Sequence, residues 1–293
     1  MPATSGELFK NIRRIQIETT HLVNDLFAGA YRSTFKGKGI EFEDVREYQI
    51  GDDIRSFDWN VTARMNKPYI KNFREERELS VMLLVDVSAS SRFGSAVRSK
   101  SELIAEIGAV LAFSAIKNND KIGLILFSDI IEKYIPPKKG LRHVLRTIRE
   151  LLAFVPKNKG TDIKKALKFL GKVHRRGGVC FLISDFLCPD FSHELKVTAR
   201  GYDLISIAIT DPFELSFPNM ALTTITDLES GKKLLVDTAD PIVQENYRKQ
   251  AIGRLTALKK LIEKIGAGFI QVKTDQPYTD ALRNFFRRRE KRR

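Results

Sequence analysis

The chain has 293 residues, of which 43% are hydrophobic and 29% are charged. This length fits one large core with at most a small appendage, and the composition excludes a low-complexity or disordered protein. The formal net charge of +14 is compatible with an acidic partner, nucleic acid or an anionic surface. No apolar run reaches the roughly 18 to 20 residues of a membrane span, and the N-terminus lacks the apolar stretch of a secretory signal. We therefore expect a cytoplasmic protein with reduced cysteines.

The first part of the chain predicts a helix followed by a loop-rich lobe. Apolar residues recur at helical spacing over residues 7–27, which favours an amphipathic helix. Glycines at positions 37, 39 and 51 then separate short extended pieces, which is typical of loops with small strands. We assign residues 1–78 to this N-terminal region.

From about Leu79 the pattern changes to apolar runs that alternate with helical segments. The runs SVMLLVDVS, KIGLILFS, GVCFLISDF, YDLISIAIT and GFIQV predict strands. Helices are expected around residues 104–111 and over 141–154, 162–173, 191–198 and 241–265, with a hairpin near Gly231. Continuous apolar strands between helices predict an α/β fold: a doubly wound, mostly parallel, Rossmann-type sheet with helices on both faces. This domain is assigned to residues 79–275, and residues 276–293 to a C-terminal helix and basic tail.

Small oxygen-bearing side chains follow the predicted strands. The pattern D-x-S-x-S, formed by Asp86, Ser88 and Ser90, comes directly after the first run, and Asp185 follows a later run. Thr161 opens a helix after a glycine, where its hydroxyl serves either as a ligand or as a helix cap. Ligands of doubly wound sheets bind beyond the carboxyl ends of the strands, so these residues are the candidate site.

Hydroxyl and carboxylate oxygens are hard ligands that suit Mg²⁺, Mn²⁺ or Ca²⁺ and suit zinc or copper poorly. A cation with one position open to solvent accepts an Asp or Glu from another protein. The ordinary alternative is that Asp86 and the serines form an Asx turn and cap the next helix. For Asp162 we favour the ordinary interpretation, a charge at the N-terminus of a helix.

This set of residues resembles the metal-ion-dependent adhesion site of von Willebrand factor A domains. The resemblance covers roughly residues 79–275 and implies a ligand set of Asp86, Ser88, Ser90, Thr161 and Asp185, with magnesium as the default ion. Further upstream, the chain is similar to the bacterial domain of unknown function 58 family. That family is often associated with MoxR-type AAA+ ATPases, which implies an ATPase partner. The residues that carry this second likeness are Gly51, Asp52, Asp53, Arg55, Asp58 and Trp59.

The sequence therefore predicts a metal-dependent protein-interaction module and not an enzyme. Ser88 replaces the second acid of an aspartyl-phosphate signature, and the chain has no phosphate-binding loop with a following lysine. The alternative is a protein that binds nucleic acid or an acidic surface through the basic tail and a lysine-rich helix. Two interpretations of Asp52, Asp53, Arg55, Asp58 and Trp59 stay open, a partner-binding surface or a capped turn with a buried tryptophan.

Overall fold

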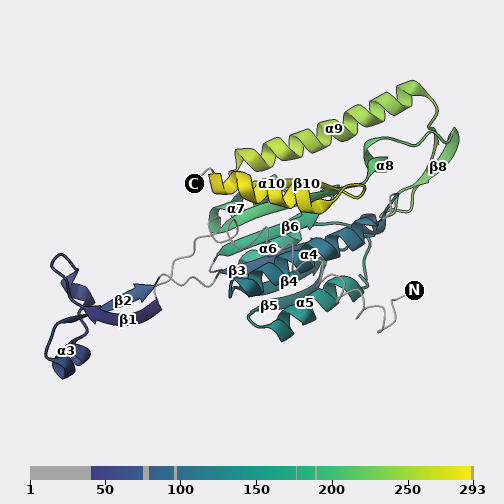
Figure 1. Ribbon diagram of the computed structural model, residues 1–293. Coiled ribbons are helices and arrows are strands. Elements are labelled where there is room, and N and C mark those ends of the chain that lie inside the picture. Colours follow the sequence, from purple (N-terminus) through teal and green to yellow (C-terminus); the bar gives the residue numbers. More distant parts are fainter. Residues whose placement is uncertain (1–40, 75–78, 96–97, 176, 189, 292–293) are drawn as a thin grey trace. The chain divides into compact units, whose positions relative to one another are not determined.

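The computed structural model describes residues 41–74, 79–95, 98–175, 177–188 and 190–291 (Figure 1). They divide into a small unit within Lys36–Leu79 and a large unit that contains Ser80–Arg293. The helix predicted over residues 7–27 lies outside the described residues. Residues 276–293, which the sequence assigned to a separate helix and tail, belong to the same unit as the large sheet.

The small unit is a two-stranded antiparallel sheet with two short helices between its strands. Strand β1 (Glu41–Glu47) pairs with β2 (Tyr69–Arg74), and η1 (Ile54–Ser56) and α3 (Trp59–Met65) lie between them in the sequence. The side chain of Asp53 caps η1, and that of Asp58 caps α3 by accepting hydrogen bonds from two backbone amides. Short polar side chains thus define both helix starts.

The large unit is built on a six-stranded sheet with the order β10-β7-β6-β3-β4-β5. Five strands are parallel: β3 (Ser80–Asp86), β4 (Lys121–Phe127), β6 (Gly178–Ser184), β7 (Tyr202–Thr210) and β10 (Gly268–Lys273). The edge strand β5 (Ile131–Lys138) runs antiparallel to β4. The predicted doubly wound, mostly parallel sheet is confirmed. Strand β5 was not predicted from the sequence; it carries two prolines, which sheets tolerate mainly in edge strands.

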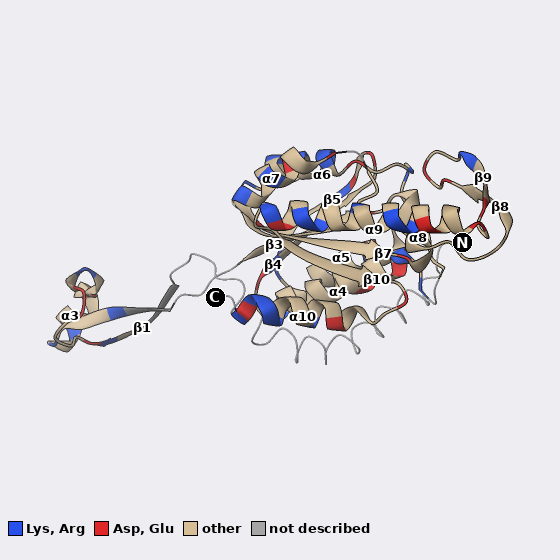
Figure 2. Cartoon of the chain, turned by 90° about the horizontal axis from the view of Figure 1, so that it is seen from above, with Lys and Arg blue, Asp and Glu red and all other residues tan. Residues whose placement is uncertain are grey.

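Helices cover both faces of this sheet (Figures 1 and 2). One face carries α4 (Lys100–Lys117), α5 (Leu141–Ala153) and α10 (Tyr278–Lys291). The other carries α6 (Ile163–Val173), α7 (Ser192–Gly201) and α9 (Pro241–Lys264). The core lies between these layers, and the central strands are buried along almost their whole length. None of the described helices is both long and apolar enough to cross a bilayer.

Three shorter elements complete the large unit. The turn after β3 forms η2 (Ala89–Arg92), and α8 (Pro212–Leu215) follows β7. Strands β8 (Leu222–Thr226) and β9 (Lys233–Asp237) form an antiparallel hairpin around Gly231, as the sequence indicated. The sequence analysis did not identify α8, whose four residues are too short to show a helical period.

The order in which successive strands are added to the sheet changes sides between the parallel neighbours β3 and β6. From β3 the strands proceed to β4 and β5 on one side, and from β6 they proceed to β7 and β10 on the other. The close pairing of β6 with β3 requires a glycine at position 178, because a Cβ atom there would lie 2.2 Å from the Ser80 carbonyl oxygen. The carboxyl ends of β3 and β6 therefore form the switch point at which such sheets bind ligands.

Candidate cation site

Asp86 joins the carboxyl ends of the two central strands. It is the last residue of β3 and only 1% exposed. Its Oδ1 atom accepts a hydrogen bond from the backbone amide of Ser88 at 2.9 Å, and its Oδ2 atom accepts one from the hydroxyl of Ser184, the last residue of β6, at 2.6 Å. The carboxylate is thus fixed in position between β3 and β6.

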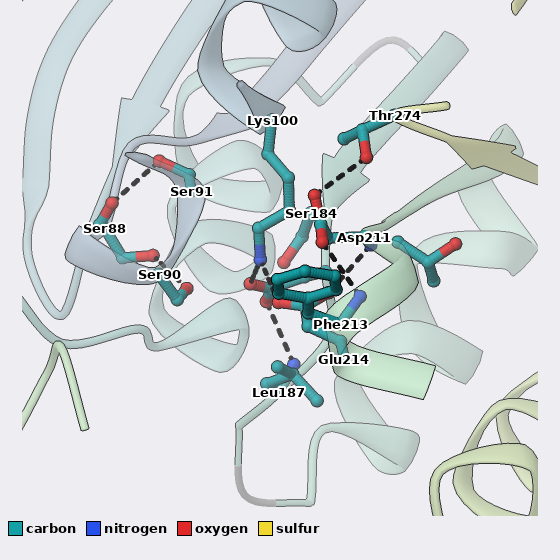
Figure 3. Close-up of polar contacts among 12 residues, drawn as sticks. Ser88, Ser90, Ser91, Lys100, Ser184, Leu187, Asp211, Phe213, Glu214 and Thr274 are labelled. Atoms are coloured by element: carbon teal, nitrogen blue, oxygen red, sulfur yellow. Dashed lines mark hydrogen bonds and ion pairs between the residues drawn. The ribbon is translucent and has the colours of Figure 1, made fainter. Parts of the chain in front are cut away.

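The two serines of the D-x-S-x-S pattern face each other. The Oγ atoms of Ser88 and Ser90 are 3.1 Å apart (Figure 3). The Ser91 hydroxyl donates to the Ser88 carbonyl oxygen at 2.7 Å and so holds the turn of η2. Neighbouring ligands of an octahedral Mg²⁺, with bonds of 2.0–2.1 Å, are about 3 Å apart. The spacing of the two hydroxyls therefore fits two adjacent positions around one such ion.

The loop that carries Thr161 lies beside η2. The Ala89 amide donates to the Lys159 carbonyl oxygen at 2.8 Å, which connects the two loops. The Thr161 hydroxyl, itself largely buried, donates to Oε1 of Glu229 at 2.8 Å. Asp162 is the N-cap of α6, and its side chain accepts from the Lys165 amide at 3.0 Å, in agreement with the helix-cap interpretation.

Asp185 is engaged by a lysine that sequence analysis missed. The Lys100 ammonium is 0% exposed and lies 2.7 Å from Oδ2 of Asp185 and 2.5 Å from Oε1 of Glu214 (Figure 3). Asp185 also accepts a hydrogen bond from the Leu187 amide through Oδ1 at 3.1 Å. Lys100 is the first residue of α4, where a lysine ordinarily suggests a solvated helix end, so the sequence carried no signal for this contact.

Lys100, Asp185 and Glu214 form an ion triad, and Glu214 also braces the turn that follows β7. Glu214 uses its other oxygen, Oε2, to accept from the Asp211 amide at 3.0 Å, which completes a capping box at the start of α8. Asp211 accepts from Ser95 and from the Thr274 hydroxyl. Burial raises the pKa of Asp211, but these hydrogen bonds outweigh it and hold the pKa below its usual value. Asp211 is therefore an ionised structural acid.

The charges of the triad balance only in part. Burial lowers the pKa of Lys100, but Asp185 and Glu214 raise it more, so the ammonium is charged. Burial also keeps the pKa of Glu214 above its usual value despite the contact with Lys100. When Asp185 and Glu214 are both ionised, the single positive charge of Lys100 balances only one of them, so a cation would find a net negative charge here.

The donor set at this edge consists mainly of hydroxyls. The described part of the chain contains no cluster of three or more His, Cys, Asp or Glu side chains that could hold a metal ion. A cation here would depend on Ser88, Ser90 and Thr161 together with Asp86, while Asp185, bound to Lys100, would act through water. Such an oxygen set suits Mg²⁺, Mn²⁺ or Ca²⁺ and suits zinc poorly.

We expect Asp86 to make the cation-free protein less stable as the pH rises. Burial, followed by the nearby charge of Asp185, raises the pKa of Asp86 to about 7. The folded state therefore retains a proton that the unfolded state loses near pH 4, and the free energy of unfolding decreases between these values. From pH 5 to 6.5 the decrease attributable to Asp86 should be about 2 kcal/mol. Urea unfolding in the presence of a chelator measures it.

The variant Asp86→Asn provides the comparison for this prediction. Glu214, whose raised pKa acts in the same direction, is present in both proteins, so the difference between them isolates Asp86. The wild type should lose stability with rising pH more steeply than Asp86→Asn. Parallel curves would show that the Asp86 carboxyl titrates normally in the folded protein.

The residues between positions 51 and 59 that carry the second family resemblance have different roles in the small unit. Asp52 forms a bidentate contact with Arg46 and accepts from the Gln49 amide, whereas Asp53 and Asp58 cap η1 and α3. Arg55 is exposed. Trp59 is 70% exposed, so the interpretation that it is buried by packing was wrong. It stacks on Phe57, with ring centroids 5.2 Å apart.

The basic C-terminal helix α10 packs against strand β10 of the large sheet. Tyr278, Leu282 and Phe286 of α10 are buried, and Arg289 forms an ion pair with Asp203. Figure 2 shows Lys and Arg positions distributed over α6, α7, α9 and α10. Binding of nucleic acid through the tail remains a prediction from charge.

The chain is similar to several known proteins. The family described as "Protein of unknown function DUF58" matches residues 44–255. "Uncharacterized protein Rv1480" of Mycobacterium tuberculosis is 27% identical over 271 residues, which cover 91% of this chain and 85% of that protein. The structure of BatB from Bacteroides thetaiotaomicron is 16% identical with a TM-score of 0.48, and it covers 73% of this chain and 99% of its own. The SpRpn10 VWA domain is 11% identical with a TM-score of 0.42, and it covers 71% of this chain and 94% of its own.

The observed fold has a mostly parallel central sheet between two helical layers. The family match begins in the small unit and extends into α9, so it includes both the upstream residues and the candidate site. It spans well over half of the 293 residues. The chain therefore belongs to the DUF58 family.

Proposed function

We propose that the chain is a cation-dependent protein-interaction module that performs no catalysis of its own. One Mg²⁺, or Mn²⁺ or Ca²⁺ in its place, is held by Asp86, Ser88, Ser90 and Thr161, with Asp185 acting through water. The observation that supports this most strongly is the 3.1 Å separation of the Ser88 and Ser90 hydroxyls beside a buried carboxylate at the sheet's switch point. When bound, the cation supplies a positive charge that attracts an acidic side chain of the partner.

The partner that we propose is a MoxR-type AAA+ ATPase. Support comes from the likeness of residues 51–59 to proteins associated with such ATPases. The small unit also exposes several large apolar side chains that a partner could cover. The most exposed of them are Ile50, Ile54, Trp59 and Met65.

A groove in the large unit adds apolar surface beside the candidate site. It encloses about 770 Å³ between the segment after β6 and helix α9, and its lining includes Asp185, Glu214, Arg254 and Leu258. A peptide whose acidic side chain approaches the cation would place neighbouring apolar side chains in this groove. The cation would then determine whether the partner binds, and the groove would determine which sequences bind.

Capture of the ATPase tests the proposal. The immobilised full chain is incubated with a MoxR-type ATPase from the same cell in Mg²⁺, in a chelator, and in chelator followed by excess Mg²⁺. We expect the chelator to reduce capture at least about ten-fold, because a charge-assisted contact is lost, and the added Mg²⁺ to restore it. Equal capture under all three conditions would rule out a cation-dependent contact.

The same assay tests the exposed surface of the small unit. Trp59→Ala should weaken capture about ten-fold or more, because exposed tryptophans that a partner buries contribute strongly to binding. Leu141→Ala is the matched control, since Leu141 is an exposed apolar residue of the large unit. Loss of capture in both variants, or in neither, would remove Trp59 from the interface.

A further inference from the structure

Glu229 brings a carboxylate from a distant part of the chain to the candidate cation site. It lies in the turn between β8 and β9, 68 residues after Thr161, whose hydroxyl donates to its Oε1 atom at 2.8 Å. A Cβ atom placed on Gly160 would lie 4.0 Å from the other oxygen, Oε2. The carboxylate of Glu229 is thus positioned over the Gly160–Thr161 backbone, at the edge of the proposed ligand set.

Within the described part of the chain, the Glu229 carboxylate forms no ion pair. Among the residues that the structure describes, no Lys or Arg lies within ion-pair distance of this carboxylate. A second acid adjoins the same point, because the Gly160 Cβ position is 3.5 Å from the Cβ atom of Asp129. The Oδ1 atom of Asp129 is buried and has no hydrogen-bond partner. Two ionised acids that adjoin Gly160 repel each other unless a cation lies between them.

The turn that carries Glu229 is ordered by its own hydrogen bonds. The Glu229 amide donates to Oδ1 of Asp227 at 3.1 Å, and the Gly231 amide donates to the Asp227 carbonyl oxygen at 2.8 Å. Gly231 has a φ of +70°, which glycine adopts without strain. These contacts fix the backbone of the turn and leave the Glu229 side chain free to reach the Thr161 loop.

The strands of the hairpin are held weakly by burial. None of the ten residues of β8 and β9 is buried, and Leu222, Leu234 and Leu235 are each more than 60% exposed. At the base, the buried Thr238 connects the hairpin to α9 through its carbonyl oxygen, which accepts from Gln244 at 2.6 Å. A hairpin with a fixed base and few buried contacts opens at low free-energy cost.

We propose that Glu229, at the tip of hairpin β8–β9, is an internal acidic ligand of the cation site. Its carboxylate occupies the coordination position that an acidic side chain of the partner fills when the partner binds. This inference rests on the proposed function and adds a means of regulating it. An internal carboxylate acts at a high effective concentration, and a partner must displace it. A protein that offers only an acidic side chain would then not bind. The site would select partners that also contact hairpin β8–β9 and keep it away from the cation.

Uptake of Mn²⁺ alone, measured by the electron paramagnetic resonance of the free ion, tests this role. Glu229→Gln retains the size of the side chain and its bond to Thr161 but removes the charge. We expect this variant to bind Mn²⁺ about ten-fold more weakly than the wild type. Removal of a side chain that supports a bound metal usually lowers the metal affinity by about ten-fold or more. Asp237→Asn is the matched control because it removes an exposed acid from the same hairpin and should leave Mn²⁺ binding unchanged.

Capture of the ATPase in saturating Mg²⁺ provides the second measurement. Glu229→Gln should capture more ATPase than the wild type, because the internal competitor is weakened, and Asp237→Asn should capture the same amount. Equal Mn²⁺ affinity of Glu229→Gln and the wild type would overturn the internal-ligand role while leaving the cation site intact. Weaker Mn²⁺ binding without increased capture would overturn the competition. A wild type that takes up no Mn²⁺ would instead refute the proposed function itself.

Discussion

Replacement of Lys100 by methionine should lower the free energy of unfolding by about 3 to 5 kcal/mol. The ammonium is fully buried and forms ion pairs with Asp185 and Glu214, and its loss leaves two acids uncompensated next to each other. Removing one partner of a buried ion pair is strongly destabilising because it leaves an uncompensated buried charge. Replacing the whole pair by apolar residues often has little effect on the free energy of unfolding. Urea unfolding of Lys100→Met and the wild type at pH 7 measures the difference.

Two further variants make this prediction specific. Lys117→Met changes the same residue type at the exposed opposite end of α4 and should cost less than about 1 kcal/mol. Adding Asp185→Asn and Glu214→Gln to Lys100→Met removes the uncompensated charges and should recover most of the lost stability. If Lys100→Met unfolds within about 1 kcal/mol of the wild type, the ammonium does not hold the two acids in the folded protein.

Replacement of both Ser88 and Ser90 by alanine should abolish the stabilisation that a divalent cation gives. In the wild type, Mg²⁺ at 100 times its dissociation constant should raise the free energy of unfolding by about 3 kcal/mol, because it binds only the folded state. The double variant lacks the two hydroxyls that lie 3.1 Å apart and should show no such rise. Thermal unfolding with and without Mg²⁺ measures this effect.

Ser101→Ala is the matched control, since Ser101 is an exposed serine of α4. It should retain the full response to Mg²⁺. The Asp86 carboxylate accepts from the Ser88 backbone amide, a contact that an alanine preserves, so the fold of the double variant should persist. An undiminished response of the double variant to Mg²⁺ would place the ion elsewhere on the protein.

The sequence predicted most of the large unit because its strands are buried on both sides. Apolar runs such as GVCFLIS correspond to β6, and the expected helix over residues 141–154 is α5, Leu141–Ala153. The edge strand β5 was not predicted because three charged residues and two prolines interrupt its apolar residues, so it lacks the continuous apolar run that identified the others. Continuous burial leaves a clear sequence signal, and half-exposed edges do not.

The candidate site was only partly predictable. Asp86, Ser88 and Ser90 follow one strand, and the rule for switch points is sufficient to place them. Lys100 and Glu229 could not be found, because their roles depend on contacts across 85 and 68 residues that no local pattern records. For Trp59 the sequence left burial and partner binding open, and its 70% exposure in the structure removes the first of these.

Diffraction from crystals of the protein soaked in Mn²⁺ tests the central claim most directly. The account predicts an anomalous difference peak at the carboxyl end of β3, within about 2.0 to 2.6 Å of the Ser88 and Ser90 Oγ atoms. The ion should lie on the side of these hydroxyls that faces Thr161. With Mn²⁺ at saturating concentration, a map without a peak at this edge of the sheet would contradict the cation site and the function built on it.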